Sequence, residues 1–190
     1  MKPVLEQSRE IKNQADTIIY DRGLDALLSE YGEVAYTGSY ALDLMMKKDI
    51  DVSLVNPTLT LRQFFELGYR VAELVKPHSM FHRNTKIKPV DGRPDQAYYW
   101  RFHFDEWSLD IWRVSKDYHQ ASVEYLSSIQ NALTLERVRV ILALKHKSLE
   151  KNLYGVHFGS KQLYPAVLSG RVRTFDELRE YLATQHAVTI

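Results

Sequence analysis

Cysteine is absent from this sequence of 190 residues. Its absence excludes disulfide bonds, thiolate metal sites and cysteine nucleophiles together. Disulfide-stabilised proteins are mostly secreted, so a chain without cysteine fits an intracellular compartment. We therefore expect a cytoplasmic protein.

Long apolar runs are missing as well. No run approaches the roughly 18 residues that a transmembrane helix requires. The first ten residues, Met-Lys-Pro-Val-Leu-Glu-Gln-Ser-Arg-Glu, are too polar for a signal peptide. The sequence thus predicts no membrane partner.

The chain also lacks a strong net charge, because 25 basic residues nearly balance 24 acidic ones. A net charge of +1 provides no overall field to attract nucleic acid, so a polynucleotide partner would need a local basic patch. The composition is otherwise that of a folded globular protein, with 45% hydrophobic and 12% aromatic residues. A chain of this length can bury a core as one domain or two small ones.

The most informative stretch joins a Gly-Ser pair to two closely spaced aspartates. Gly38 and Ser39 lie between a predicted strand over 33–37 and a predicted helix from Tyr40 to about Met46. Asp49 and Asp51 then open the alternating run Asp-Ile-Asp-Val-Ser-Leu-Val, which is typical of a strand. Alternation places both carboxylates on one face, where a hard divalent cation such as Mg²⁺ would relieve their repulsion. We interpret the stretch as half of a metal site beside a phosphate-binding turn.

Helical patterns surround a central group of strands. Gly23 is predicted to break the first helical region, Gly32 to cap its end, and Thr58 or Thr60 to cap the next helix. A turn is predicted at Asp91-Gly92, and Ser160 is predicted to cap a short helix. Helices are expected over about 4–31, 61–75, 118–129, 135–149, 161–168 and 175–182, and strands over about 33–37, 49–55, 80–88, 98–104 and 107–114.

A third carboxylate comes from Asp110. If Asp105-Glu106 forms a two-residue hairpin loop, Phe102 faces Leu109 and Arg101 faces Asp110. The resulting core face carries Trp100, Phe102, Phe104, Leu109 and Ile111, and the opposite face carries Arg101, His103 and Asp110. Asp110 has two interpretations: a solvated partner of Arg101, or a third metal ligand. The upstream motif favours the second.

These features together resemble the DNA polymerase beta-like nucleotidyltransferase superfamily. Its pattern of Gly-[Gly/Ser], a short spacer, Asp-apolar-[Asp/Glu] and a later acid is matched by Gly38-Ser39, Asp49-Ile50-Asp51 and Asp110. Thr37 departs from it, since an apolar residue is usual there. The run from Tyr154 to Lys161 is similar to one in small bacterial members of the superfamily.

The resemblance implies an α+β fold, in which a short mixed β-sheet flanked by helices is followed by a helical C-terminal region. We divide it into domains 1–114 and 115–190. It also implies an enzyme that transfers a nucleoside monophosphate from an NTP, with ATP as the guessed donor, to an acceptor hydroxyl. Two Mg²⁺ ions, or Mn²⁺, would be held by Asp49, Asp51 and Asp110, while Gly38 and Ser39 would bind phosphate.

Several assignments stay open at this point. Arg101 and Lys48 are further candidates for phosphate contact, although a solvated Lys48 is the simpler interpretation. His78 and His82 are four residues apart, but Pro77 argues against the helix that a zinc site there would need. The acceptor could be a small molecule such as an antibiotic, or a protein. The alternatives are a non-catalytic nucleotide- or partner-binding module, or an RNA- or protein-modifying toxin–antitoxin component.

Overall fold

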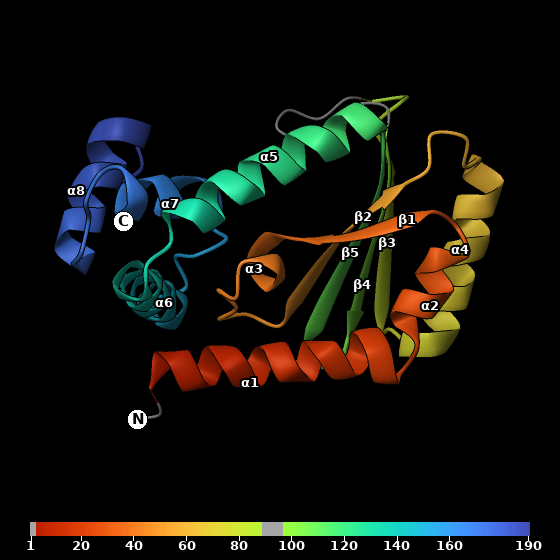
Figure 1. Cartoon of the computed structure of the whole chain (residues 1–190), viewed down its shortest axis with the longest axis horizontal. Coiled ribbons are helices and arrows are strands. Elements are labelled where there is room, and N and C mark those ends of the chain that lie inside the picture. The colour runs from red at the N-terminus through yellow and green to blue at the C-terminus, as the bar shows by residue number, and fades with distance from the viewer. Residues whose placement is uncertain (1–2, 89–96) are drawn as a thin grey trace. The chain divides into compact units, whose positions relative to one another are not determined.

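The computed structural model describes residues 3–88 and 97–190 (Figure 1). The chain forms two compact units, one of Glu10–Leu126 and the other of Met1–Arg9 with Ser127–Ile190. The division falls inside helices α1 (Val4–Asp16) and α5 (Lys116–Ala132). The predicted domains 1–114 and 115–190 place the division elsewhere, and that assignment stays a prediction.

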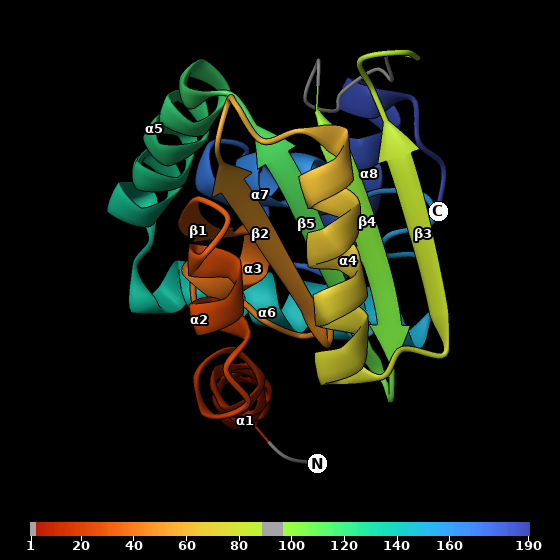
Figure 2. The ribbon, with the colours of Figure 1, turned by 90° about the vertical axis from the view of Figure 1, so that its right-hand side faces the viewer.

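The larger unit is built on a five-stranded mixed sheet in the order β1-β2-β5-β4-β3 (Figure 2). Strand β2 pairs in parallel with β5, and the other pairs are antiparallel. Four strands match the predicted bounds, whereas β3 ends before the predicted Lys88. The predicted Asp91-Gly92 turn lies outside the described residues. The strands are β1 (Glu33–Thr37), β2 (Asp49–Val55), β3 (Ser79–Asn84), β4 (Tyr98–Phe104) and β5 (Trp107–Val114).

One face of this sheet forms the main hydrophobic core, and its members were predicted from strand alternation. Trp100, Phe102, Phe104, Leu109 and Ile111 are all buried in it, as expected from the hairpin register. The π-helical turn η1 (Thr17–Asp21) and helices α1, α2 (Leu24–Ser29) and α4 (Leu61–Val75) contribute further apolar side chains. Figure 2 shows α2 and α4 lying across the sheet. The opposite face carries the polar residues of the candidate site together with a smaller apolar cluster that includes Tyr99, Trp112 and Val114.

The two predicted glycine roles in the N-terminal region have different outcomes. Gly23 separates η1 from α2 with a φ of 83°, so the predicted break is confirmed. Gly32 is not the cap of α2, because that helix ends at Ser29 with Glu30 as its C-cap. A Cβ at Gly32 would lie 3.0 Å from both Asn56 Cβ and Val55 O. Close chain approach is therefore the reason for glycine at this position.

Thr60, one of two predicted caps, begins α4. Its side chain accepts a hydrogen bond from Gln63 N while Gln63 Oε1 accepts one from Thr60 N, which is a complete capping box. We expect Thr60→Ala to lower the free energy of unfolding by about 1 kcal/mol in urea denaturation. Thr58→Ala is the matched control, since the Thr58 hydroxyl bonds only Asn56 Oδ1 on the surface. Its effect should stay within about 0.5 kcal/mol; equal losses would contradict the capping assignment.

The smaller unit contains helices α6 (Leu135–Glu150), α7 (Ser160–Leu168) and α8 (Phe175–His186). Thr134 caps α6 through a hydrogen bond that its side chain accepts from Arg137 N, and Leu135, the first residue of that helix, is 58% exposed. The predicted Ser160 cap is wrong: the N-cap is Gly159, and the Ser160 hydroxyl bonds Tyr154 Oη instead, at 2.6 Å. Across the described chain, no helix has the length and apolar character needed to cross a bilayer.

Candidate functional site

The Gly38-Ser39 turn follows β1 directly and lies against Asp51. Gly38 has a φ of 63°, and a Cβ placed on it would overlap Asp51 Oδ2 and lie 3.1 Å from Asp51 Cγ. Both the backbone conformation and the available space therefore require glycine here. The backbone at Gly38 thus approaches a carboxylate predicted to bind metal.

The helix after this turn is shorter than predicted. Helix α3 spans only Gly38–Ala41, not Tyr40 to Met46, because Asp43 adopts a φ of 57°. Leu44 N donates to Ser39 O at 2.9 Å and Asp43 N donates to Tyr40 O at 3.3 Å, which are the two bonds of a Schellman ending. Thr37 is the N-cap of this helix, and Ser39 lies inside it. Its side chain is mostly buried.

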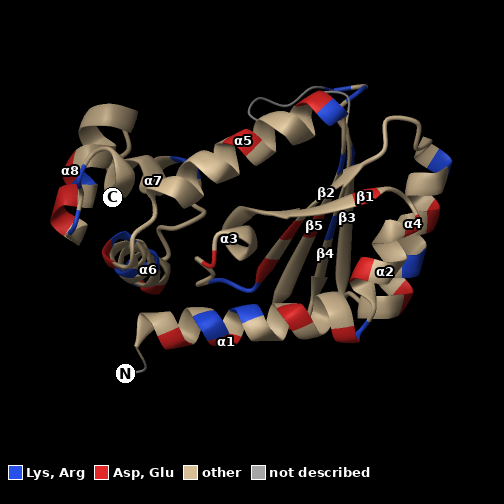
Figure 3. Cartoon of the chain, viewed as in Figure 1, with Lys and Arg blue, Asp and Glu red and all other residues tan. Residues whose placement is uncertain are grey.

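The three predicted carboxylates share the sheet face opposite the main core. Asp51 lies beside Asp110 in the parallel β2–β5 register and beside Thr37 in the β1–β2 register. Asp49 lies two residues earlier on β2, beside Ser108. Figure 3 shows the acidic positions on β2 near α3, preceded by a basic loop segment. The structure therefore brings the Gly-Ser turn and all three aspartates to one region, as the motif predicted.

Asp110 is also held by Arg101, its predicted cross-strand partner. Arg101 Nε donates to Asp110 Oδ1 at 2.7 Å and Nη2 donates to Oδ2 at 2.5 Å, forming a bidentate pair. The side chains are 38% and 10% exposed, respectively. Hydrogen bonding to Asp110 raises the pKa of the Arg101 guanidinium against the opposing effect of burial, and the charges of Asp110 and Asp51 add to the rise.

A second donor to Asp110 was missed from the sequence. The Tyr99 hydroxyl donates to Asp110 Oδ1 at 2.9 Å. Tyr99 precedes Arg101 by two residues, so strand alternation already placed both on one face. The sequence contains twelve tyrosines, however, and nothing in it distinguished the Tyr99 hydroxyl from the others. Together the three hydrogen bonds use most of the acceptor capacity of the Asp110 carboxylate, and Oδ2 keeps one further lone pair.

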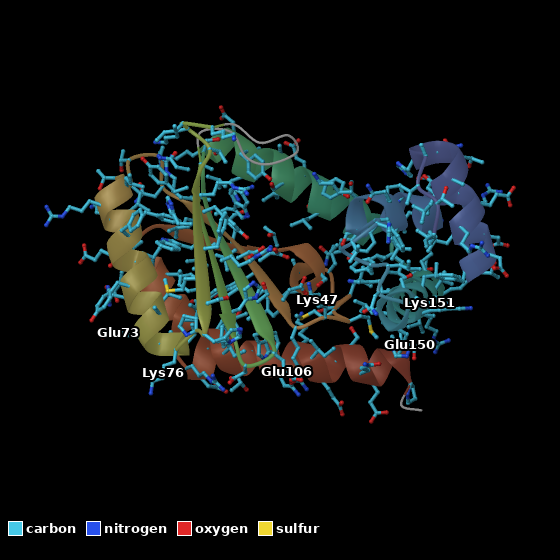
Figure 4. All side chains as sticks on the ribbon, turned by 180° about the vertical axis from the view of Figure 1, so that it is seen from behind. Lys47, Glu73, Lys76, Glu106, Glu150 and Lys151 are labelled. Atoms are coloured by element: carbon cyan, nitrogen blue, oxygen red, sulfur yellow. The ribbon has the colours of Figure 1, made fainter. Side chains whose placement is uncertain are left out.

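The lysines before Asp49 lie at the edge of this region. Lys48 Nζ forms an ion pair with Glu106 Oε2 at 2.7 Å, so its predicted phosphate contact would require leaving that partner. Lys47 is exposed, and with Glu106 it borders a hollow of about 190 Å³ near the β4–β5 turn. Both side chains are labelled in Figure 4. Phosphate binding by Lys48 stays a prediction.

The donor chemistry of the site matches a hard cation, although the three acids do not form a closed cage. Among the described residues, no three His, Cys, Asp or Glu side chains gather closely enough to hold a metal ion. Asp49 and Asp51 are both partly exposed on one face of β2. Mg²⁺ is commonly bound by one or two carboxylates together with substrate phosphates. Two carboxylates beside a backbone cradle fit that mode of binding.

Comparison with known proteins supports the fold through structure alone. No protein-family model and no curated sequence matches the chain. Among solved structures, the polymerase core of TRAMP, an RNA surveillance complex, superimposes with a TM-score of 0.57 at 14% identity over 94% of this chain. The fold is shared. This structural similarity confirms the predicted α+β, nucleotidyltransferase-type architecture of a mixed sheet flanked by helices.

Two further solved structures are similar over much of the chain. A cytoplasmic RNA terminal U-transferase has a TM-score of 0.47 at 17% identity, over 80% of this chain and 46% of its own. The CdnC–HORMA-deltaN complex of E. coli MS115-1 has a TM-score of 0.46 at 17% identity, over 95% and 64%. The chain spans 59% of the TRAMP polymerase chain, so each known protein is longer than the part matched here.

Proposed function

We propose that this protein is a metal-dependent nucleotidyltransferase. It would transfer a nucleoside monophosphate from an NTP, with ATP as the first donor to test, to a hydroxyl group of an acceptor. The observation that supports this most directly is the approach of the Gly38 backbone to Asp51, with Asp49 and Asp110 on the same sheet face. A turn position that excludes even a methyl group beside a carboxylate suits a shared phosphate and cation site.

The residues present suggest how the cation would be held. Asp49 and Asp51 would supply its carboxylate oxygens. A ligand role for Asp110, through the remaining lone pair of Oδ2, would require the three acids to lie closer together than they do here. A bound Mg²⁺ or Mn²⁺ would neutralise triphosphate charge and make the acceptor hydroxyl more acidic. The triphosphate oxygens would complete its coordination.

The chain's own residues would then position the reacting groups. The acceptor oxygen attacks the α-phosphorus, the bond from that phosphorus to the bridging oxygen breaks, and pyrophosphate leaves. The hydroxyl proton passes to a carboxylate of the site and then to water. Gly38 would let its backbone N–H approach the phosphates, since glycine carries no side chain of its own. Reactions of this kind depend on positioning and charge neutralisation more than on covalent help from the protein.

One observation favours a second candidate function, a non-catalytic nucleotide-binding module. Arg101 and Tyr99 already satisfy three acceptor positions of Asp110, as a purely structural aspartate would require. Under this alternative Asp49 and Asp51 still bind a nucleotide with its cation, but no transfer follows.

Calorimetry and turnover separate the two candidates. The full chain would be titrated with ATP and Mg²⁺, and pyrophosphate release would be measured with four NTPs and a panel of aminoglycosides, lincosamides, tRNA and protein extract. Release that depends on one acceptor and stops with EDTA supports the transferase. Tight binding without release across the panel supports the module, and the absence of binding contradicts both.

A further inference from the structure

A small cavity lies on the same sheet face as the three aspartates, next to Arg101. Its volume is about 190 Å³, and it is lined by Phe81, Arg83, Tyr99, Arg101 and Trp112. Register explains its place: Phe81, Arg101, Asp110 and Asp51 form one row across the sheet. Arg83, Tyr99 and Trp112 form the adjacent row. The cavity therefore adjoins the candidate site on the side away from Gly38.

The charges around this cavity do not balance. Arg101 is paired with Asp110, whereas Arg83 lies over the Phe81 ring at 5.2 Å and has no ion-pair partner among residues 3–88 and 97–190. The lining described for this cavity therefore carries two guanidinium groups, on neighbouring strands, and no carboxylate. Arg101 holds Asp110 through Nε and Nη2, so its Nη1 lies outside that bidentate pair. An anion could then contact Arg83 and Arg101 while the Asp110 pair stays intact.

The walls of the cavity are fixed by aromatic packing. The Tyr99 and Trp112 rings stack with centroids 4.1 Å apart, and Phe81 meets Tyr99 edge-on at 6.2 Å. Tyr99 is further held by its hydrogen bond to Asp110. Ligand pockets usually measure about 300–1,000 Å³, so this one suits a single end of a ligand and not a whole nucleotide. A rigid, cationic cavity of this size fits a phosphate group.

We propose that this cavity, formed around Arg83 and Arg101, binds a phosphate monoester carried by the acceptor. The assignment to the acceptor rests on the proposed transferase function, because the donor triphosphate is expected at Gly38 and Asp51. Strand β3 is three strands from β2, roughly 14 Å at ordinary strand spacing. Guanidinium groups bind phosphate oxygens in a bidentate manner, whereas a lysine ammonium binds them as a single point charge with less geometric specificity.

Phosphate binding can be measured without metal, nucleotide or turnover. The probe is ribose 5-phosphate in EDTA, with ribose as the uncharged comparison, titrated calorimetrically into the full chain. We expect the phosphate ester alone to bind, and Arg83→Met to lower its association constant at least about tenfold. Arg83→Lys should retain part of the affinity. Arg62→Met is the matched control. Arg62 is an exposed arginine of α4, and α4 packs on the other face of the sheet. This variant should change the association constant less than about twofold.

Further measurements separate this proposal from the transferase proposal and from donor binding. Asp51→Asn should abolish transfer but leave ribose 5-phosphate binding unchanged, so each proposal can fail alone. Arg83→Met should leave the affinity for ATP with Mg²⁺ within about twofold. A tenfold loss there would assign the cavity to the donor and overturn the acceptor assignment. Equal binding of ribose, no binding by the unaltered protein up to about 10 mM, or an unaffected Arg83→Met variant would overturn the phosphate site itself.

Discussion

Asp51→Asn is expected to lower nucleotide transfer by about a thousandfold or more while leaving the protein folded. The amide keeps the shape of the side chain against Gly38 but removes the charge that a divalent cation requires. The substitution should not lower the stability of the protein, in contrast to its effect on transfer. Asp49 and Asp51 are same-face neighbours on β2, and Asp110 lies beside Asp51, so neutralising one charge relieves repulsion. We expect the free energy of unfolding to stay constant or rise by up to about 1 kcal/mol.

The measurement pairs pyrophosphate release with urea unfolding of the same samples. Asp43→Asn is the control, because Asp43 is an exposed acid near the same loop that pairs with Lys12, and asparagine tolerates its φ of 57°. That variant should keep transfer within about twofold. Full activity in Asp51→Asn would refute the mechanism. A loss of activity accompanied by a large loss of stability would show instead that Asp51 serves the fold.

Strand alternation and turn chemistry were enough to predict the β4–β5 hairpin that carries Asp110, while the mixed sheet as a whole was implied by the family resemblance. The two-residue loop at Asp105-Glu106 determined which residues of β4 and β5 face each other, and the observed pairs Phe102–Leu109 and Arg101–Asp110 follow from it. Asp105 adopts a φ of 49°, as such a tight hairpin requires. Local patterns are informative here because the side-chain period of a strand leaves only two faces to choose between.

Three features of the site and its surroundings were harder to predict. The helix after Gly38 ends early through the Schellman bonds to Ser39 O and Tyr40 O. The apolar residues up to Met46 favoured a longer helix, but Leu44, Met45 and Met46 are buried outside any helix. The Tyr99 hydrogen bond to Asp110 likewise needs a particular side-chain conformation as well as a shared face. The Arg83 cavity arises from three strands, one of which, β3, lies at the edge of the sheet. None of these has a sequence pattern of its own.

Gly38→Ala is expected to be the most damaging single methyl addition near the site. An alanine with positive φ costs about 1–2 kcal/mol, and the new methyl group would also overlap Asp51 Oδ2. Displacing that carboxylate adds about 1–3 kcal/mol, as in other overpacked positions. We therefore expect a total loss of about 2–5 kcal/mol in urea unfolding, with transfer falling in parallel because the carboxylate moves.

Gly23→Ala and a double variant isolate the contact from the backbone strain. Gly23 has a φ of 83° but open space around the position of a Cβ, so Gly23→Ala should lose only the conformational part, about 1–2 kcal/mol. Combining Gly38→Ala with Asp51→Ala removes the overlapping oxygen. The pair should therefore be more stable than the sum of the single effects predicts, by about 1–3 kcal/mol. Additive losses would mean that the backbone at Gly38 does not approach Asp51, and the phosphate cradle on which the proposed function depends would lose its physical basis.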